Sequence, residues 1–240
     1  MSETRDAAVN DARKAAVSDA RNARPIRTFH PRRGRMSARH FDAHAELWPR
    51  FGLMITDGDR SPLDLAGLFG RRAPVVLEIG FGMGDATAAM AAAEPGRDFL
   101  GVEVHTPGIG NLLALAGELG LTNVRVAHGD AMQLVHRIAP GALDAVHVFF
   151  PDPWPKARHH KRRLIQPANV ALLRDRLRPG GVLHCATDWP DYAVAMAETL
   201  EADPELRRLP AMPHGRPATK FERRGTAAGR PITDLRYARA

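Results

Sequence analysis

The sequence predicts an α/β fold with a mostly parallel central sheet of about seven strands and helices on both faces. The main observation is an alternation of short apolar runs with alanine- or leucine-rich stretches of helical length, repeated from Pro74 onward. Glycine and proline separate these segments, for example at Pro95-Gly96, Gly120 and Pro179-Gly180-Gly181. Strands and helices that alternate at such lengths form parallel sheets, because each helix returns the chain to the edge where the next strand begins.

The expected elements follow in chain order. Apolar, β-branched runs predict strands at 75–79, 99–104, 123–127, 143–150 and 182–186. The stretches after them predict helices at 85–93, 108–119, 132–138, 167–177 and 189–201. Upstream, we expect a helix at 38–48, stopped by Pro49, and another at 60–70 with Ser61 as N-cap and Pro62 in the first turn. The chain from Pro204 is expected to end in one or two edge strands.

Composition limits the class of protein. The 240 residues suffice for one large α/β domain with extensions. No stretch approaches the roughly 18 apolar residues of a membrane helix, and the N-terminus lacks the apolar core of a secretory signal. Cys185 is the single cysteine, so an internal disulfide and a cysteine zinc site are excluded. We therefore expect a cytoplasmic protein without membrane contact.

The net charge of +7 is unevenly distributed. Residues 1–35, 156–163 and 216–240 each have a balance of +5, which leaves −8 on the rest of the chain. An acidic body with basic segments suits a protein whose body binds a cation and whose segments hold a polyanion. The charge distribution alone is equally compatible with basic tails that contact only water. We expect residues 1–35 to be a disordered basic arm and 36–240 to be a single domain with a basic C-terminal segment.

A glycine-rich turn, Gly80-Phe81-Gly82-Met83-Gly84, follows the first strand of the repeat. Parallel sheets bind ligands outside the carboxyl ends of their strands, and glycine lets a ligand approach the backbone there. The dinucleotide pattern G-x-G-x-x-G is not met, because Asp85 stands at its third glycine. Glu78 lies just before the turn and would repel a pyrophosphate. It would suit S-adenosyl-L-methionine, which carries an ammonium and a sulfonium and no phosphate.

Three further acids stand at the ends of the next three strands. Glu103 lies where a carboxylate can accept from ribose hydroxyls, and Asp130 where one can accept from an adenine amino group. Asp152 follows the fourth strand. Each acid alone reads more simply as solvated surface. Together they predict a nucleoside-binding rim that prefers a cation.

The segment from Leu143 to Arg163 changes character twice, from apolar strand to Pro151-Asp152-Pro153-Trp154-Pro155 and then to a basic run. The prolines end the strand and place Asp152 rigidly. A carboxylate can accept from N–H groups of a base, Trp154 or Phe150 can stack on it, and the basic run can hold phosphates. The structural alternatives are a core Trp154 and a solvated helix start.

Three other motifs are less specific. His159 and His160 lack a third ligand at suitable spacing and lie among cations, so we reject a metal site. Thr187-Asp188-Trp189 is a further acid–aromatic pair at the rim, and Asp188 also fits a helix N-cap. Thr219-Lys220-Phe221-Glu222 by spacing alone is a charged loop.

The motifs VLEIGFGMGD, FLGVEVH, NVRVAHGDA, FFPDPWPKARHHKRRL, ATDW and TKFERRG occur in this order. With them the sequence closely resembles the bacterial tRNA (guanine-N7-)-methyltransferases, which implies a Rossmann-like class I methyltransferase fold. The resemblance runs from about Pro74 to the C-terminus. It extends more loosely from Arg27, where RTFHPRRGRM looks like the family's N-terminal arm. The tail up to about Arg24 has no clear counterpart.

The resemblance implies methyl transfer from S-adenosyl-L-methionine to N7 of a guanine in the variable loop of tRNA. It implies cofactor contacts by the rim acids and the turn, that is, Glu78, Gly80, Gly82, Gly84, Glu103, Asp130 and Asp152. Asp152 would also be catalytic. The implied substrate-binding residues are Lys156, Asp188, Thr219, Lys220, Phe221 and Glu222. The implied RNA contacts are Arg158, His159, His160, Lys161, Arg162 and Arg163.

Chemistry qualifies the role of Asp152. Guanine N7 carries a lone pair and no proton, so no general base is needed. We hypothesise that Asp152 acts by position and charge. Two alternatives stay open: a methyltransferase of exocyclic amino groups, whose strand ends resemble P-D-P-W, and a non-enzymatic RNA-binding protein. A monomer and a weak homodimer are equally compatible with the sequence.

Overall fold

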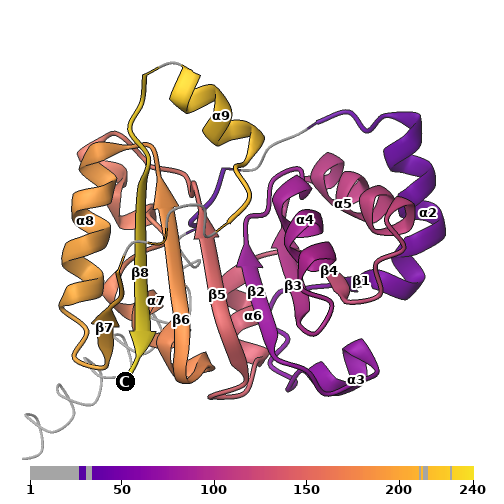
Figure 1. Cartoon of the computed structure of the whole chain (residues 1–240), viewed down its shortest axis with the longest axis horizontal. Helices are drawn as coiled ribbons and strands as arrows, with labels where there is room; N and C mark the ends of the chain where they lie inside the picture. The colour runs from indigo at the N-terminus through magenta and orange to yellow at the C-terminus, as the bar shows by residue number, and fades with distance from the viewer. Residues whose placement is uncertain (1–26, 31–33, 211, 213–215, 228) are drawn as a thin grey trace, which may run out of the picture.

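The computed structural model describes residues 27–30, 34–210, 212, 216–227 and 229–240 (Figure 1). The predicted disordered arm falls mostly on residues 1–26 and 31–33, which lie outside the described residues. Within the described part, eight strands form one sheet in the order β1-β4-β3-β2-β5-β6-β8-β7. This confirms the predicted α/β class, with one strand more than expected.

Six strands of the sheet run parallel: β1 Gly52–Met54, β2 Val75–Ile79, β3 Asp98–Glu103, β4 Val124–His128, β5 Leu143–Phe149 and β6 Leu177–Thr187. The antiparallel strand β8, Thr233–Arg239, lies between β6 and the edge strand β7, Leu206–Arg208. The prediction of C-terminal edge strands is therefore right for β7, whereas β8 is an internal strand.

Helices cover both faces of the sheet (Figure 1). On one face, α2 Ala38–Phe51, α4 Asp85–Ala93 and α5 Thr106–Glu118 pack over one apolar cluster. On the other, α3 Leu65–Phe69, α6 Ala131–Arg137, α7 Pro167–Arg176 and α8 Pro190–Glu201 pack over a second. Every residue of β2 is buried, and its neighbours Val76 and Leu77 belong to opposite clusters. This explains why β2 is a continuous apolar run rather than an alternating one.

Two predicted helix boundaries are wrong. The helix at 38 does not stop at Pro49, because α2 continues to Phe51, and its C-cap Gly52 donates to the Trp48 carbonyl. The helix expected from Arg60 begins only at Leu65, with Asp64 as N-cap. Ser61 instead donates its hydroxyl to Asp59 at 2.7 Å. A local side-chain bond thus competes with the helix start.

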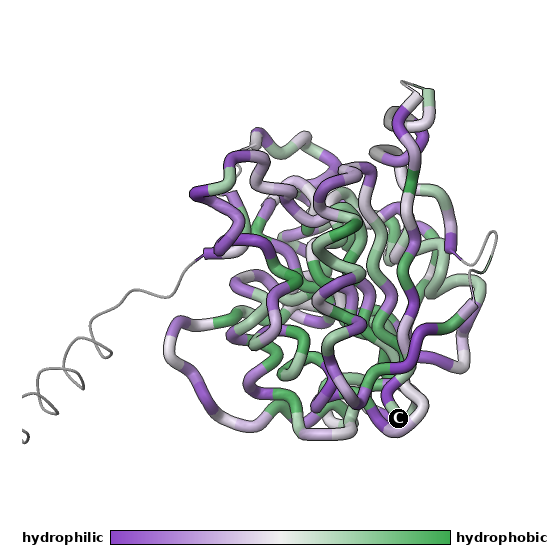
Figure 2. Tube along the Cα trace, turned by 90° about the vertical axis from the view of Figure 1, so that its left-hand side faces the viewer, coloured by the Kyte–Doolittle hydropathy of each residue, from purple (hydrophilic) through white to green (hydrophobic). Residues whose placement is uncertain are grey.

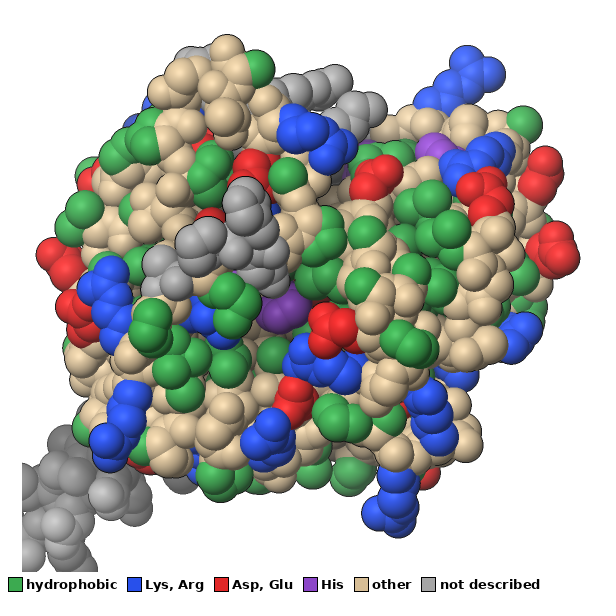
Figure 3. Space-filling model, in the orientation of Figure 1, with side chains coloured by type: hydrophobic (Ala, Val, Ile, Leu, Met, Phe, Trp, Pro, Cys, Tyr) green, Lys and Arg blue, Asp and Glu red, His purple; other side chains and the backbone are tan. Residues whose placement is uncertain are grey.

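Hydrophobic residues run through the middle of the molecule (Figure 2). On the face shown in Figure 3, hydrophobic side chains are interrupted by polar groups, and Lys and Arg are spread over several places. Within the described ranges, no helix is long and apolar enough to cross a membrane.

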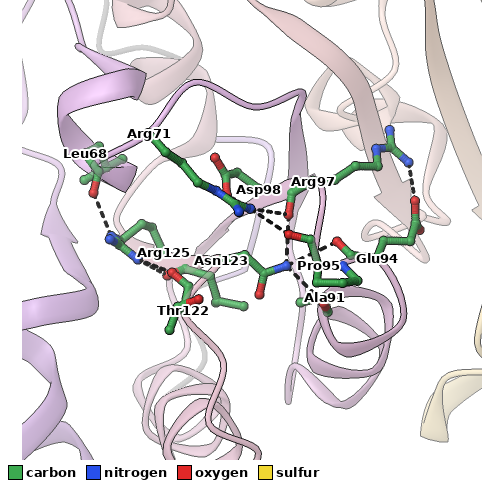
Figure 4. Close-up of polar contacts among 11 residues, drawn as sticks. Leu68, Arg71, Ala91, Glu94, Pro95, Arg97, Asp98, Thr122, Asn123 and Arg125 are labelled. Carbon is green, nitrogen blue, oxygen red and sulfur yellow. Dashed lines mark hydrogen bonds and ion pairs between the residues drawn. The ribbon is translucent and has the colours of Figure 1, made fainter.

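A polar network fixes the amino ends of β3 and β4 (Figure 4). Asp98 is buried and accepts from Arg71 Nε at 2.9 Å. The side chain of Asn123 donates to the carbonyls of Ala91 and Arg97, each at 2.9 Å. These hydrogen bonds tie the loops at this end of the sheet together. The carboxyl ends of the strands carry a different set of groups.

Candidate active site

Five acids lie at or just beyond the carboxyl ends of five neighbouring strands. In the order of the sheet, β4, β3, β2, β5 and β6, they are Asp130, Glu103, Glu78, Asp152 and Asp188. These strands are parallel, so the acids share one edge of the sheet. The sequence predicted this row from single strand ends, and the strand order shows that its members are neighbours. Such an edge is where open α/β sheets bind ligands.

The glycine turn between β2 and α4 faces open space. Gly80, Gly82 and Gly84 have φ values of 73°, 62° and 79°, a region that glycine adopts without strain. A Cβ added at Gly80 or Gly82 would meet no heavy atom within 4 Å. The turn therefore needs glycine for its backbone conformation, and it leaves room for a ligand beside the acids.

Glu78 is the buried acid of the row, with 3% of its surface exposed. Its carboxylate accepts from the Thr87 hydroxyl at 2.7 Å. Its pKa is raised to about 7, mainly by burial and to a lesser extent by the nearby charge of Glu103, while the Thr87 hydrogen bond and the Arg216 charge act in the opposite direction. A cationic ligand beside Glu78 would favour its charged form.

Glu103 and Asp130 are held by backbone amides. Glu103 accepts from the N–H of Gly82 at 2.9 Å and of His105 at 3.0 Å. Asp130 is the N-cap of α6 and accepts from Met132 N at 2.8 Å. Carboxylates have about four acceptor positions, so these bonds orient both groups and leave capacity for hydroxyl or amino donors.

Asp152 lies in a strained loop. Phe150 and Trp154 on either side of it have φ values of 52° and 46°, which non-glycine residues rarely adopt. Asp152 is 16% exposed, and its Oδ2 accepts from the backbone N–H of His30 at 2.9 Å. The strained backbone and the flanking prolines hold the carboxylate in one place at the rim.

Trp154 is buried, which agrees with the alternative interpretation of Trp154 as a core residue. It is 3% exposed, and the His30 ring stacks on it with centroids 3.8 Å apart. The Arg162 guanidinium carbon lies 4.9 Å from the indole centroid. The indole that we expected to face the guanine is thus covered by His30 in this structure.

The basic run forms a short 3₁₀ helix, η1 Ala157–Arg162. Lys156, Arg158, Lys161 and Arg162 are exposed, and His159 and His160 are half-buried. The prediction for Arg163 needs correction, because its side chain is 3% exposed. It donates to the Pro153 carbonyl at 2.9 Å and to Asp191 at 2.5 Å, so its guanidinium is engaged by groups of the protein itself.

No group of three or more His, Cys, Asp or Glu among the residues that the structure describes could hold a metal ion.

Asp188 does not cap α8, whose N-cap is Trp189. It pairs with Arg230 Nε at 3.0 Å instead. The helix-cap alternative for Asp188 is therefore wrong.

Thr219-Lys220-Phe221-Glu222 begins helix α9, Lys220–Ala227, which lies above the carboxyl ends of the parallel strands (Figure 1). Glu222 N donates to the Thr219 hydroxyl at 3.0 Å, and Thr219 N donates to Glu222 at 3.2 Å. This is a capping box, which the T-x-x-E spacing could have indicated and which we interpreted as a loop. The segment therefore presents an ordered helix start at the rim.

Arg216 is the site residue that sequence reasoning missed. It is 5% exposed at the side chain and pairs with both Glu222 and Asp234. In the sequence it is one arginine of a basic tail, and no spacing rule relates it to Asp234, 18 positions away.

A parallel sheet with one inserted antiparallel strand, a glycine turn after β2 and acids along the carboxyl edge define a Rossmann-like class I methyltransferase. Two solved structures share this fold at 18% identity. The 16S rRNA methyltransferase KamB gives a TM-score of 0.52 over 78% of this chain and 98% of its own. The 16S rRNA (adenine(1408)-N(1))-methyltransferase from Catenulisporales acidiphilia gives 0.51 over 75% and 96%.

Residues 72–235 match the family described as "Putative methyltransferase". Proteins named tRNA (guanine-N(7)-)-methyltransferase match more closely still. That of Halorhodospira halophila is 53% identical over 89% of this chain and 95% of its own length. That of Burkholderia vietnamiensis is 55% identical over 88% and 84%, and that of Streptomyces avermitilis 52% over 90% and 76%. The chain belongs to the tRNA (guanine-N(7)-)-methyltransferase family.

Proposed function

We propose that the protein transfers the methyl group of S-adenosyl-L-methionine to N7 of a guanine in the variable loop of tRNA. The observation that carries the proposal is the position of Asp152, which belongs to the row of rim acids and lies in the loop that leads from β5 to the exposed cations of η1. A base brought to Asp152 by the RNA backbone would lie beside a ligand on the neighbouring strands. The relatives named above support guanine N7 of tRNA as the target.

The residues of the rim fit this cofactor. Buried Glu78 suits a cationic ligand, Glu103 suits ribose hydroxyls, and Asp130 suits an adenine amino group. The turn formed by Gly80, Gly82 and Gly84 is open at Gly80 and Gly82, where it would admit a ligand close to the backbone. A structure of a mutant of the Catenulisporales enzyme, with a TM-score of 0.52 and 18% identity, is described as containing the cosubstrate SAM.

When bound, S-adenosyl-L-methionine supplies an electrophilic methyl group on a positively charged sulfur. Asp152 would hold the guanine edge so that the N7 lone pair points along the axis of displacement. The purine gains positive charge as N7 forms its new bond, and the Asp152 carboxylate would stabilise that charge. No proton has to leave N7, so Asp152 works by position and charge.

The remaining expected contacts are part of the proposal. Lys156, Asp188 and the α9 start (Thr219, Lys220, Phe221 and Glu222) would bind the substrate. Arg158, His159, His160, Lys161 and Arg162 would contact RNA. We propose 36–240 as one methyltransferase domain after a basic arm at 1–35. A cytoplasmic location and a monomer or weak homodimer remain predictions.

His30 competes for the same carboxylate. It donates its backbone N–H to Asp152, and its Nδ1 lies 3.2 Å from the same oxygen. Its ring also stacks on the indole of Trp154 and covers one face of it. A guanine that reaches Asp152 therefore has to share this site with the arm or displace it.

The test is methyl transfer to an unmodified tRNA transcript with methyl-labelled cofactor, followed by digestion and identification of the labelled base. We expect N7-methylguanine. A transcript with 7-deazaguanine, which lacks N7, is the control and should stay unlabelled. Label at an exocyclic N2 or N6 would favour the first alternative, and tRNA binding without transfer would favour the second.

A further inference from the structure

Arg216 lies in the segment before α9 and buries almost its whole side chain. Burial disfavours its charge, but the hydrogen bonds to Glu222 and Asp234 outweigh this and raise its pKa. The side chain is therefore a charged guanidinium inside the protein. Because a buried charge is costly unless it is paired, its partners indicate what it holds in place.

The guanidinium bridges two carboxylates from different elements. Its Nη1 donates to Glu222 Oε2 at 2.5 Å, and its Nε donates to Asp234 Oδ1 at 3.0 Å. The second terminal nitrogen reaches the other oxygen of each acid, at 3.3 Å and 3.2 Å. Asp234 also pairs with His184 of β6 at 2.8 Å. The start of α9 is thus joined through one side chain to β8 and β6.

The same guanidinium lies against the end of β5. Its central carbon is 4.9 Å from the Phe149 ring centroid and 5.3 Å from that of Phe150. Phe150 has the strained φ of 52° and is separated from Asp152 by one proline. Arg216 therefore contacts both the helix start implied in substrate binding and the rings of the two residues that lead into the Asp152 loop.

We propose that Arg216 is a positioning residue for methyl transfer, which holds the Thr219–Glu222 capping box against the end of β5 so that both meet the same guanine. This inference rests on the proposed function. Arginine is required because a planar fork can serve two carboxylates while its face covers aromatic rings. A lysine would keep the positive charge but lacks the planar group that donates to two carboxylates at once.

The experiment compares Arg216→Lys, Arg216→Gln, Glu222→Gln and the Arg216→Gln/Glu222→Gln double variant with wild type. Arg208→Gln is the matched control, because Arg208 on β7 is exposed and pairs with Glu201 at 2.7 Å. Steady-state transfer to tRNA, the cofactor Kd and thermal unfolding are measured for each. Wild-type transfer is measured first, and its failure would refute the proposed function rather than this inference.

We expect Arg216→Gln to lower kcat/KM for tRNA by about 100-fold and Arg216→Lys by about tenfold, as for misplaced catalytic groups. The cofactor Kd of Arg216→Lys should stay within about twofold of wild type, because the charge is kept. The double variant should be no worse than Arg216→Gln, because both changes break one contact. The control should match wild type.

Three outcomes would overturn the inference. Full activity of Arg216→Lys would show that the fork is not needed. Additive losses in the double variant would separate Arg216 from Glu222. Loss of cofactor binding together with a lower unfolding temperature in Arg216→Lys would make Arg216 a residue of general stability.

Discussion

The backbone N–H of His30 donates to Oδ2 of Asp152 at 2.9 Å, across 122 positions of sequence. The imidazole lies flat on Trp154, and the Trp154 Nε1 donates to the Thr28 carbonyl at 3.3 Å. A planar ring with a donor nitrogen thus stands at the carboxylate proposed to hold a purine. The arm segment 27–30 and the strained loop around Asp152 form one unit.

Removal of the imidazole is expected to favour the substrate. His30→Ala keeps the backbone donor but removes the ring from Trp154 and Asp152. If the ring competes with guanine, kcat/KM for tRNA rises about two- to fivefold, because more of the enzyme is open to the base. Steady-state kinetics measure this, with His136→Ala, an exposed residue of α6, as control. A fall of similar size would show that the imidazole helps to hold the base.

Asp152→Asn tests the role of charge. The amide keeps the shape of the carboxylate and cannot stabilise the positive charge that develops on the purine. We expect kcat to fall about 100-fold. Asp144→Asn, on the same strand but paired with Arg97 and Arg178 at its other end, is the control. A fall of only a few-fold would exclude the electrostatic role.

Glu78 should make stability depend on pH. Its pKa is about 7 in the folded protein against an ordinary 4.5, so the folded state holds its proton more tightly. Its contribution is fully present below about pH 4.5 and is lost as the pH rises toward 7. Glu78→Gln should therefore raise the unfolding free energy at pH 8 by on the order of 3 kcal/mol, with no gain below pH 4.5.

Urea unfolding of both proteins at pH 4.5 and pH 8 measures this difference. The same variant should bind the cofactor more weakly at pH 8, because it cannot become an anion. A stabilised variant with unchanged cofactor affinity would remove Glu78 from the proposed site. If the unfolding free energies of the variant and the wild type differed by the same amount at both pH values, the raised pKa of Glu78 would be contradicted.

The exposed cations of the basic run should control the salt dependence of RNA binding. Changing Lys156, Arg158 and Lys161 to Ala is expected to weaken tRNA binding and to reduce the slope of log K against log salt by about 2. Cofactor affinity should not change. Replacement of Arg60, Arg72 and Arg207, which are exposed elsewhere, removes the same charge as a control. An unchanged slope would exclude the run from the interface.

Arg163 in the same run should behave differently. Arg163→Ala removes a buried side chain that donates to Pro153 and Asp191 and lies 4.7 Å from the Tyr192 ring centroid. We expect a loss of about 2 kcal/mol of stability, since the variant loses a buried side chain together with its packing on Tyr192 and its hydrogen bond to the Pro153 carbonyl. Urea unfolding measures the loss. A lower salt slope without loss of stability would restore Arg163 to the RNA contacts.

Much of the rim could be predicted from local patterns. Parallel strands bring their carboxyl ends to one edge, so an acid at the end of each run, as with Glu103 and Asp130, predicts a shared site before any pairing is known. The glycine turn was predictable for a similar reason, because φ values such as that of Gly82 depend on the local backbone. The family motifs added the reaction and the substrate.

The sequence by itself therefore determined the strand–helix alternation, the acids at the strand ends and the membership of the family. The tertiary structure alone decided which cations face outward, what covers Trp154 and what holds α9 in place. Arg158 and Arg163 look alike in the sequence, but Arg163 is buried against Tyr192 and against Asp191, which lies 28 positions further along the chain. Arg216 acquires its role through Asp234 and Phe149. Local conformation follows short-range periodicity, whereas the pairing of buried charges depends on partners that only the folded chain brings together.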